Sequence, residues 1–127
     1  MIVDDEPDIL ISLRSIFEKQ DFDVTCVESG SKCIEELEKG FKGIILMDIM
    51  MPEMTGWDTV REILNRDLMN NIAIEIITGK GTKDHALMGE LEAYIYDYLS
   101  KPFNLKMLIS SVNKCSHYLD VKSHQGF

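Results

Sequence analysis

The chain has 127 residues, 45% of them hydrophobic and 28% charged, which fits one globular domain with its own hydrophobic core. Its 13 Lys and Arg residues stand against 22 Asp and Glu residues, giving a net charge of −9. This balance argues against a nucleic-acid-binding surface, which needs clustered positive charge, and favours proteins or cations as partners.

The first part of the chain alternates short apolar stretches with amphipathic ones. Residues 1–3 are typical of the end of a strand, and from Pro7 onward apolar side chains recur with helical spacing on one face. Pro7 itself suits the first turn of a helix. Residues 22–27 predict a second strand, and residues 31–39 predict a second helix that Gly40 would end.

The middle of the chain contains a strand of a different kind. The stretch 43–48 is apolar until its final acid, and a strand without alternation is typical of a parallel sheet that is covered on both faces. Residues 57–69 predict a third helix, and residues 72–77 predict a fourth strand. Glu75 interrupts that apolar strand, so we expect it to be partly exposed or paired, because an unpaired buried carboxylate is costly.

The last part of the chain predicts three more elements. A helix is expected over residues 82–92, with Thr82 as its N-cap, followed by a strand over residues 94–99. Asn104 can cap a final helix that ends near residues 118–121. The chain therefore alternates strands and helices from one end to the other.

This alternation predicts an α/β fold. Right-handed crossovers turn such an order into a single doubly wound parallel sheet with helices on both faces. We assign residues 1–121 to this one domain and residues 122–127 to a short C-terminal tail. In open sheets of this kind ligands bind beyond the carboxyl ends of the strands, so the residues that follow each strand are candidates for the site.

Polar side chains follow four of the predicted strands. Asp4 and Asp5 follow the first strand, Asp48 ends the third, Thr78 follows the fourth and Lys101 follows the fifth. Carboxylates held close together raise each other's proton affinity unless a cation separates them. A hard divalent cation with oxygen ligands, Mg²⁺, is the predicted occupant.

The same residue types match the needs of phosphoryl transfer. That reaction requires a nucleophile in line with the phosphorus, a metal ion, and positive or hydrogen-bond-donating groups at the phosphoryl oxygens. Asp48 would be the nucleophile and form an acyl phosphate. The Thr78 hydroxyl and the Lys101 ammonium would bind separate phosphoryl oxygens.

Each strand end belongs to a short motif, and the motifs occur in the order 3–7 (VDDEP), 46–56 (LMDIMMPEMTG), 76–79 (IITG) and 97–103 (DYLSKPF). With these motifs in this order, the chain resembles the response-regulator receiver family of two-component signalling over essentially its whole length. The resemblance implies a flavodoxin-like sheet in the order 2-1-3-4-5 with five flanking helices. It also implies a domain that accepts a phosphoryl group on Asp48 from a histidine kinase or phosphotransfer protein.

The resemblance further implies roles for individual residues. Asp5, Asp48 and the backbone carbonyl of Met50 would bind Mg²⁺ directly, and Asp4 would reach the ion through water. The peptide bond between Lys101 and Pro102 would be cis.

Two further residues would complete a conformational switch. Thr78 would shift toward the phosphoryl group, and the ring of Tyr98 would then turn inward. Met50 and Lys80, each placed two residues beyond a site residue, would tune the lifetime of the phosphate.

The resemblance and the sequence together also predict partners and a cellular location. The domain would control a downstream protein or an output domain, and a homodimer through the fourth helix, fifth strand and fifth helix is a further expectation. It would catalyse only its own phosphorylation and dephosphorylation and bind neither nucleic acid nor membrane. We expect no signal peptide and no membrane span, and reduced thiols at Cys26, Cys33 and Cys115, so the expected compartment is the cytoplasm.

Alternative functions stay open at this point. The chain could be a stand-alone receiver or a receiver cut from a larger regulator or hybrid kinase. An aspartate-nucleophile phosphatase of the haloacid dehalogenase kind is a remote alternative, since Met50 stands where that chemistry needs a second Asp. A flavodoxin-like cofactor binder is disfavoured because Asp4, Asp5 and Glu6 would repel a phosphate.

Overall fold

The computed structural model describes residues 1–79 and 89–125. Helices and strands alternate along it, as the sequence predicts. The elements are β1 (Ile2–Val3), α1 (Pro7–Glu18), β2 (Cys26–Val27), α2 (Gly30–Glu38), β3 (Gly43–Asp48), α3 (Gly56–Asn65), β4 (Ile72–Gly79), the 3-10 helix η1 (Gly89–Tyr94), β5 (Ile95–Lys101) and α5 (Leu105–Gln125).

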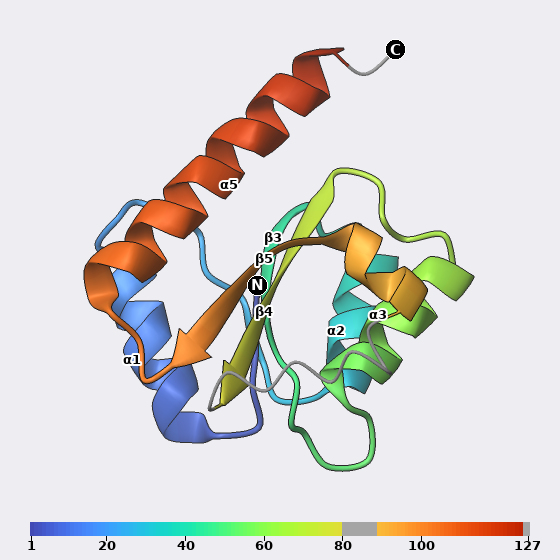
Figure 1. Cartoon of the computed structure of the whole chain (residues 1–127), viewed down its shortest axis with the longest axis horizontal. Helices are drawn as coiled ribbons and strands as arrows, with labels where there is room; N and C mark the ends of the chain where they lie inside the picture. The colour runs from blue at the N-terminus through green and yellow to red at the C-terminus, as the bar shows by residue number, and fades with distance from the viewer. Residues whose placement is uncertain (80–88, 126–127) are drawn as a thin grey trace.

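The strands form one parallel sheet in the order β2-β1-β3-β4-β5, which confirms the predicted fold class. α1 and α5 lie on one face of the sheet, and α2 and α3 lie on the other (Figure 1). β1 is short but central, because Ile2 lies opposite Cys26 of β2 and Leu46 of β3. The carboxyl ends of β1 and β3 therefore meet at one edge of the sheet.

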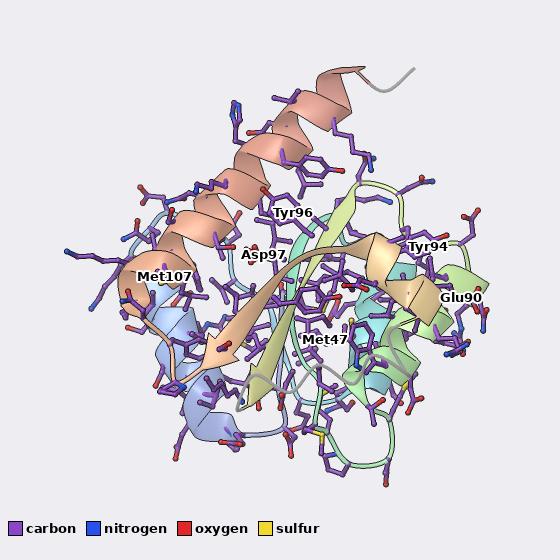
Figure 2. All side chains as sticks on the ribbon, in the orientation of Figure 1. Met47, Glu90, Tyr94, Tyr96, Asp97 and Met107 are labelled. Carbon is purple, nitrogen blue, oxygen red and sulfur yellow. The ribbon has the colours of Figure 1, made fainter. Side chains whose placement is uncertain are left out.

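The hydrophobic core has two layers, one on each face of the sheet. Neighbouring residues of a strand point to opposite faces, so Met47 packs toward α2 and α3 while Leu46 packs toward α1 and α5. Figure 2 shows Met47 in the interior of the molecule and Met107 at its outside. Both layers need apolar side chains from the same strand, which explains the unbroken apolar run of β3.

The helix starts have the caps that their sequences indicate. Pro7 opens α1. The Ser29 side chain accepts a hydrogen bond from the Lys32 N–H at the start of α2. Asn104 Oδ1 accepts one from the Met107 N–H, 3.2 Å away, which confirms its predicted role as the cap of α5. Thr55 and Asp58 form a reciprocal capping box at the start of α3.

Some predicted bounds are wrong. β2 is limited to Cys26–Val27. α3 ends at Asn65 and not at residue 69, because the chain turns at Asp67, whose φ is 56°. α5 continues to Gln125, past the predicted end.

The fourth predicted helix, over residues 82–92, lies mostly outside the described residues, as does its predicted cap Thr82. The described end of that segment is the 3-10 helix Gly89–Tyr94 and not an α-helix. Within residues 1–79 and 89–125, no helix combines the length and apolar composition needed to cross a bilayer.

Two buried features concern residues that the sequence singled out. Glu75 is fully buried, and the Ser111 hydroxyl lies 2.6 Å from its Oε1, so of the two expected alternatives, partial exposure or pairing, the structure shows pairing. The cysteines Cys26, Cys33 and Cys115 are free thiols, as expected. Burial raises the pKa of both Cys33 and Cys115 to about 12, which makes them unreactive at neutral pH.

Replacing Thr55 by Ala is expected to lower the free energy of unfolding by about 1 kcal/mol. The cause is loss of the hydrogen bond from the Asp58 N–H to Thr55 Oγ1, which spans 3.1 Å. Urea denaturation measures the change, and Thr55→Ser should retain most of the stability because it keeps the oxygen. An equal loss in the two variants would show that the cap is not the cause.

Candidate functional site

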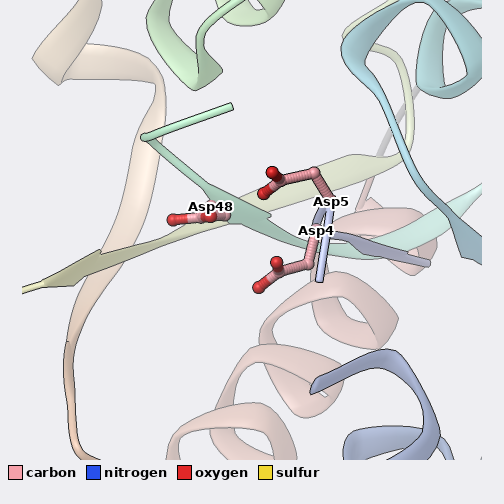
Figure 3. Close-up of side chains that lie close together, drawn as sticks. All are labelled: Asp4, Asp5 and Asp48. Carbon is pink, nitrogen blue, oxygen red and sulfur yellow. The ribbon is translucent and has the colours of Figure 1, made fainter. Parts of the chain in front are cut away.

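The carboxylates of Asp4, Asp5 and Asp48 lie together at the carboxyl ends of β1 and β3. Their nearest oxygens lie within 4.8 Å of one another, and the three side chains extend to the same side of the strand ends (Figure 3). The sheet causes this proximity, because Val3 lies opposite Met47, so Asp4, which follows β1, lies beside Asp48, the last residue of β3. Asp4 and Asp48 are buried, at 0% and 4% exposed, and Asp5 is more accessible.

Lys101, at the end of β5, supplies a positive charge to this cluster. Its Nζ lies 3.3 Å from Asp4 Oδ2 and 3.8 Å from Asp48 Oδ2. The Lys101–Pro102 peptide bond is cis, as the resemblance to the receiver family implies. The structure therefore brings four of the predicted site residues together, from three different strands.

Backbone N–H groups hold two of the carboxylates in place. The Glu6 N–H donates to Asp4 Oδ1 at 2.9 Å, and the Met50 N–H donates to Asp48 Oδ1 at 3.4 Å. The Met50 side chain is exposed. The sequence argument missed the contribution of Glu6, because a backbone donor leaves no side-chain signature.

The environment of Asp48 favours its protonated form. Burial raises the pKa of Asp48 from 3.8 to about 6, and the charges of Asp4 and Asp5 also raise it. The Lys101 ammonium and the Met50 N–H act in the opposite direction but do not balance these effects. A cation at this position would favour the ionised carboxylate, so the site is suited to bind one.

Gly56 positions the start of α3 beside the site, a role that was not predicted from the sequence. Its N–H donates to the carbonyl oxygen of Ile49 at 2.9 Å, so the start of α3 lies against the segment that carries Asp48. A Cβ at position 56 would lie 2.6 Å from the carbonyl oxygen of Asp48, closer than real Cβ atoms come. Only glycine allows α3 to approach this closely.

Of the other predicted site residues, the structure describes some only in part. Thr78 lies in β4 opposite Ser100 of β5, near the same edge of the sheet, but its side chain lies outside what the structure describes. Lys80 also lies outside the described residues. The ring of Tyr98 lies on the α3 side of the sheet, half-buried, with its centroid 6.4 Å from that of Trp57.

Comparison with known proteins assigns the family. Residues 1–113 match the family model for the response regulator receiver domain. The chain belongs to the response regulator receiver family. The receiver chain is also 34% identical over 125 residues to the response regulator SaeR of Staphylococcus aureus (strain USA300). That match covers 98% of this chain and 53% of SaeR, so the receiver chain spans about half the length of the curated relatives it matches.

Solved structures agree with this assignment. The CheY-like response regulator receiver domain protein of Methanospirillum hungatei JF-1 is 40% identical, with a TM-score of 0.88 and 94% of each chain covered. A receiver domain protein of Clostridium thermocellum is 24% identical with a TM-score of 0.80, again over 94% of each chain. The second likeness shows the shared fold alone.

Without divalent cations, the raised pKa of Asp48 predicts a loss of stability as the pH rises. The folded receiver binds this proton more tightly than the unfolded chain, so the stabilisation is complete below pH 3.8 and is lost as the pH rises through about 6. We expect a loss of about 1–3 kcal/mol from this residue, which Asp48→Asn removes.

Urea denaturation in EDTA, repeated from acid to neutral pH, measures this difference. Asp23→Asn is the matched control, because Asp23 is an exposed acid outside the cluster. A wild-type pH dependence that survives in Asp48→Asn would exclude Asp48 as its source.

Proposed function

We propose that this receiver is a phosphoacceptor switch, and that Asp48 takes a phosphoryl group from a histidine kinase or phosphotransfer protein. The observation that carries the proposal is the position of the Asp48 carboxylate among Asp4, Asp5 and the Lys101 ammonium at one edge of the sheet. The family assignment supports it. Beyond its own phosphorylation and dephosphorylation, the receiver would catalyse no reaction.

The donor set fits Mg²⁺. Asp5, Asp48 and the backbone carbonyl of Met50 would hold the ion directly, since it prefers oxygen ligands. Asp4 would act through water, which agrees with the partners that both of its oxygens have in Glu6 N–H and Lys101 Nζ. The bound ion would offset negative charge on the carboxylates and on the incoming phosphoryl group.

The transfer itself would be made by Asp48. A carboxylate oxygen of Asp48 forms a bond to phosphorus as the bond between phosphorus and the donor's histidine nitrogen breaks. Lys101 lies close enough to Asp48 for its ammonium to bind a phosphoryl oxygen on the product. The Thr78 hydroxyl would bind another, and Met50 and Lys80 would control the access of water to the phosphate.

The signal would then pass from β4 to β5. Phosphorylation adds negative charge and acceptor oxygens, which would draw Thr78 toward Asp48 and favour an active state. Tyr98 lies opposite Ile76 of β4, two residues before Thr78, and its half-buried ring packs against Trp57. Its ring would report the change to the surface that includes β5 and α5.

That surface would bind the downstream protein or output domain, or a second receiver. We place the protein in the cytoplasm, with no direct contact to nucleic acid or membrane. The receiver would occupy residues 1–121, and residues 122–127 would be a C-terminal tail, although residues 122–125 continue α5.

Asp48→Asn is expected to abolish phosphorylation, because an amide cannot act as the nucleophile. Incubation with acetyl phosphate and Mg²⁺, followed by intact-protein mass spectrometry, measures the phosphorylated fraction. Asp23→Asn removes an exposed acid and should react like the wild type. Uptake of phosphate by Asp48→Asn at the wild-type rate would reject the assignment.

Lys101→Ala is expected to slow phosphorylation by about 100-fold, the usual effect of removing one donor that stabilises charge in a transition state. The same mass-spectrometric assay gives the rate. Lys106→Ala removes an exposed lysine from α5 and serves as the control for charge alone. Equal rates for the two variants would remove Lys101 from the mechanism.

A further inference from the structure

A second group of buried polar side chains lies in the middle of the sheet, apart from the strand-end site. Glu75 is fully buried in β4, on the face that α5 covers. Its neighbours in the adjacent strands are Leu46 of β3 and Asp97 of β5. The carboxyl group of Glu75 is therefore enclosed by the sheet and α5, where its ionised form is costly.

An irregularity of β5 brings the second carboxylate to Glu75. Ile74 lies opposite Ile95, but Glu75 lies opposite Asp97, so Tyr96 is an extra residue in β5 at this point. Figure 2 shows Tyr96 and Asp97 beside α5. Without the extra residue Tyr96 would oppose Glu75, so the bulge creates the pair of carboxylates.

Ser111 of α5 lies between the two acids. Its Oγ is 2.6 Å from Glu75 Oε1 and 2.9 Å from Asp97 Oδ2. A serine hydroxyl carries one proton and can donate only one hydrogen bond. Two contacts this short therefore need a second proton, and only a protonated carboxyl group can supply it.

The second proton belongs on Glu75. Glu75 is enclosed, where a charge is costly, whereas Asp97 is exposed and its Oδ1 accepts a hydrogen bond from the Tyr98 N–H at 2.8 Å. We propose that Glu75, Ser111 and Asp97 form a proton-binding site, in which Glu75 donates to Ser111 Oγ and Ser111 donates to Asp97, and which holds α5 on the sheet. This proposal does not depend on the chemistry of Asp48.

The groups around Glu75 agree with a bound proton. Burial, and then the charges of Glu75 and Asp97, raise the pKa of Cys115 of α5, and burial and these carboxylates also raise the pKa of Tyr96 of β5, so both groups are uncharged near neutral pH. Tyr118 of α5 packs on Tyr96, with ring centroids 5.2 Å apart. No ion pair among residues 1–79 and 89–125 includes Glu75 or Asp97, so no described cation replaces the proton.

The pKa of Glu75 lies near neutral pH. Burial raises the pKa of Glu75 from 4.5 to about 7, and the charge of Asp97 raises it too, while a hydrogen bond donated by Ser111 to the ionised carboxylate acts in the opposite direction. Above this pH two carboxylates face one hydroxyl proton, so one contact to Ser111 is lost. The middle of α5, near Val112 and Cys115, is then held by apolar contacts and one remaining hydrogen bond of Ser111.

A ¹³C NMR titration of the glutamate side chains in the intact wild-type chain tests the proton site directly. After sequential assignment, the Cδ resonance of Glu75 should titrate with a midpoint near 7. A midpoint of Glu75 in the ordinary range of glutamate would overturn the proposal, and no variant is needed for this result.

Hydrogen exchange tests the effect on α5. After correction for intrinsic rates, amides around Ser111 should exchange about tenfold faster above pH 8 than below pH 6 in the wild type. Glu75→Gln should remove this dependence, because the amide cannot ionise, and Glu35→Gln should behave like the wild type. The same pH dependence in Glu75→Gln and wild type would show that Glu75 does not hold α5.

Discussion

The burial of like-charged carboxylates at the meeting point of β1 and β3 is the constraint on which the site depends. Three carboxylates and one ammonium leave two negative charges without a partner in the cluster. Burial makes that excess costly, and the raised pKa of Asp48 expresses the cost. A proton removes only one of the charges. A divalent cation offsets both charges, so this edge of the sheet is suited to bind such an ion.

The sheet and α3 together keep these charges from separating. The parallel register joins Val3 to Met47, and the two apolar layers fix this register, because a slip of one residue would turn every buried side chain to the wrong face. Gly56 then brings the start of α3 against the backbone of Asp48. The packing of apolar side chains thus holds the acids near one another against their electrostatic repulsion.

The strand ends could be predicted because their chemistry follows from topology alone. Parallel strands present their carboxyl ends at one edge of the sheet. The alternation of strands and helices predicts such a sheet, so it also predicts that Asp4, Asp48 and Lys101 lie close together. The pairing of Glu75 with Ser111 and Asp97 depends instead on one extra residue in β5. No sequence pattern marks that bulge, just as none marks the left-handed turn at Asp67 that ends α3 early.

Asp48 and Glu75 show how position separates two buried acids of similar proton affinity. Burial is the largest cause of the raised pKa in both, but Asp48 lies at the rim among other acids while Glu75 lies under a helix. The rim includes the more accessible Asp5, so the cluster there is suited to a cation. The space between β4 and α5 contains one hydroxyl as a partner, so the exchangeable ligand that fits there is a proton. Asp97, which accepts the N–H of Tyr98, lies in the same strand as Lys101, so the proton site and the strand-end site share β5.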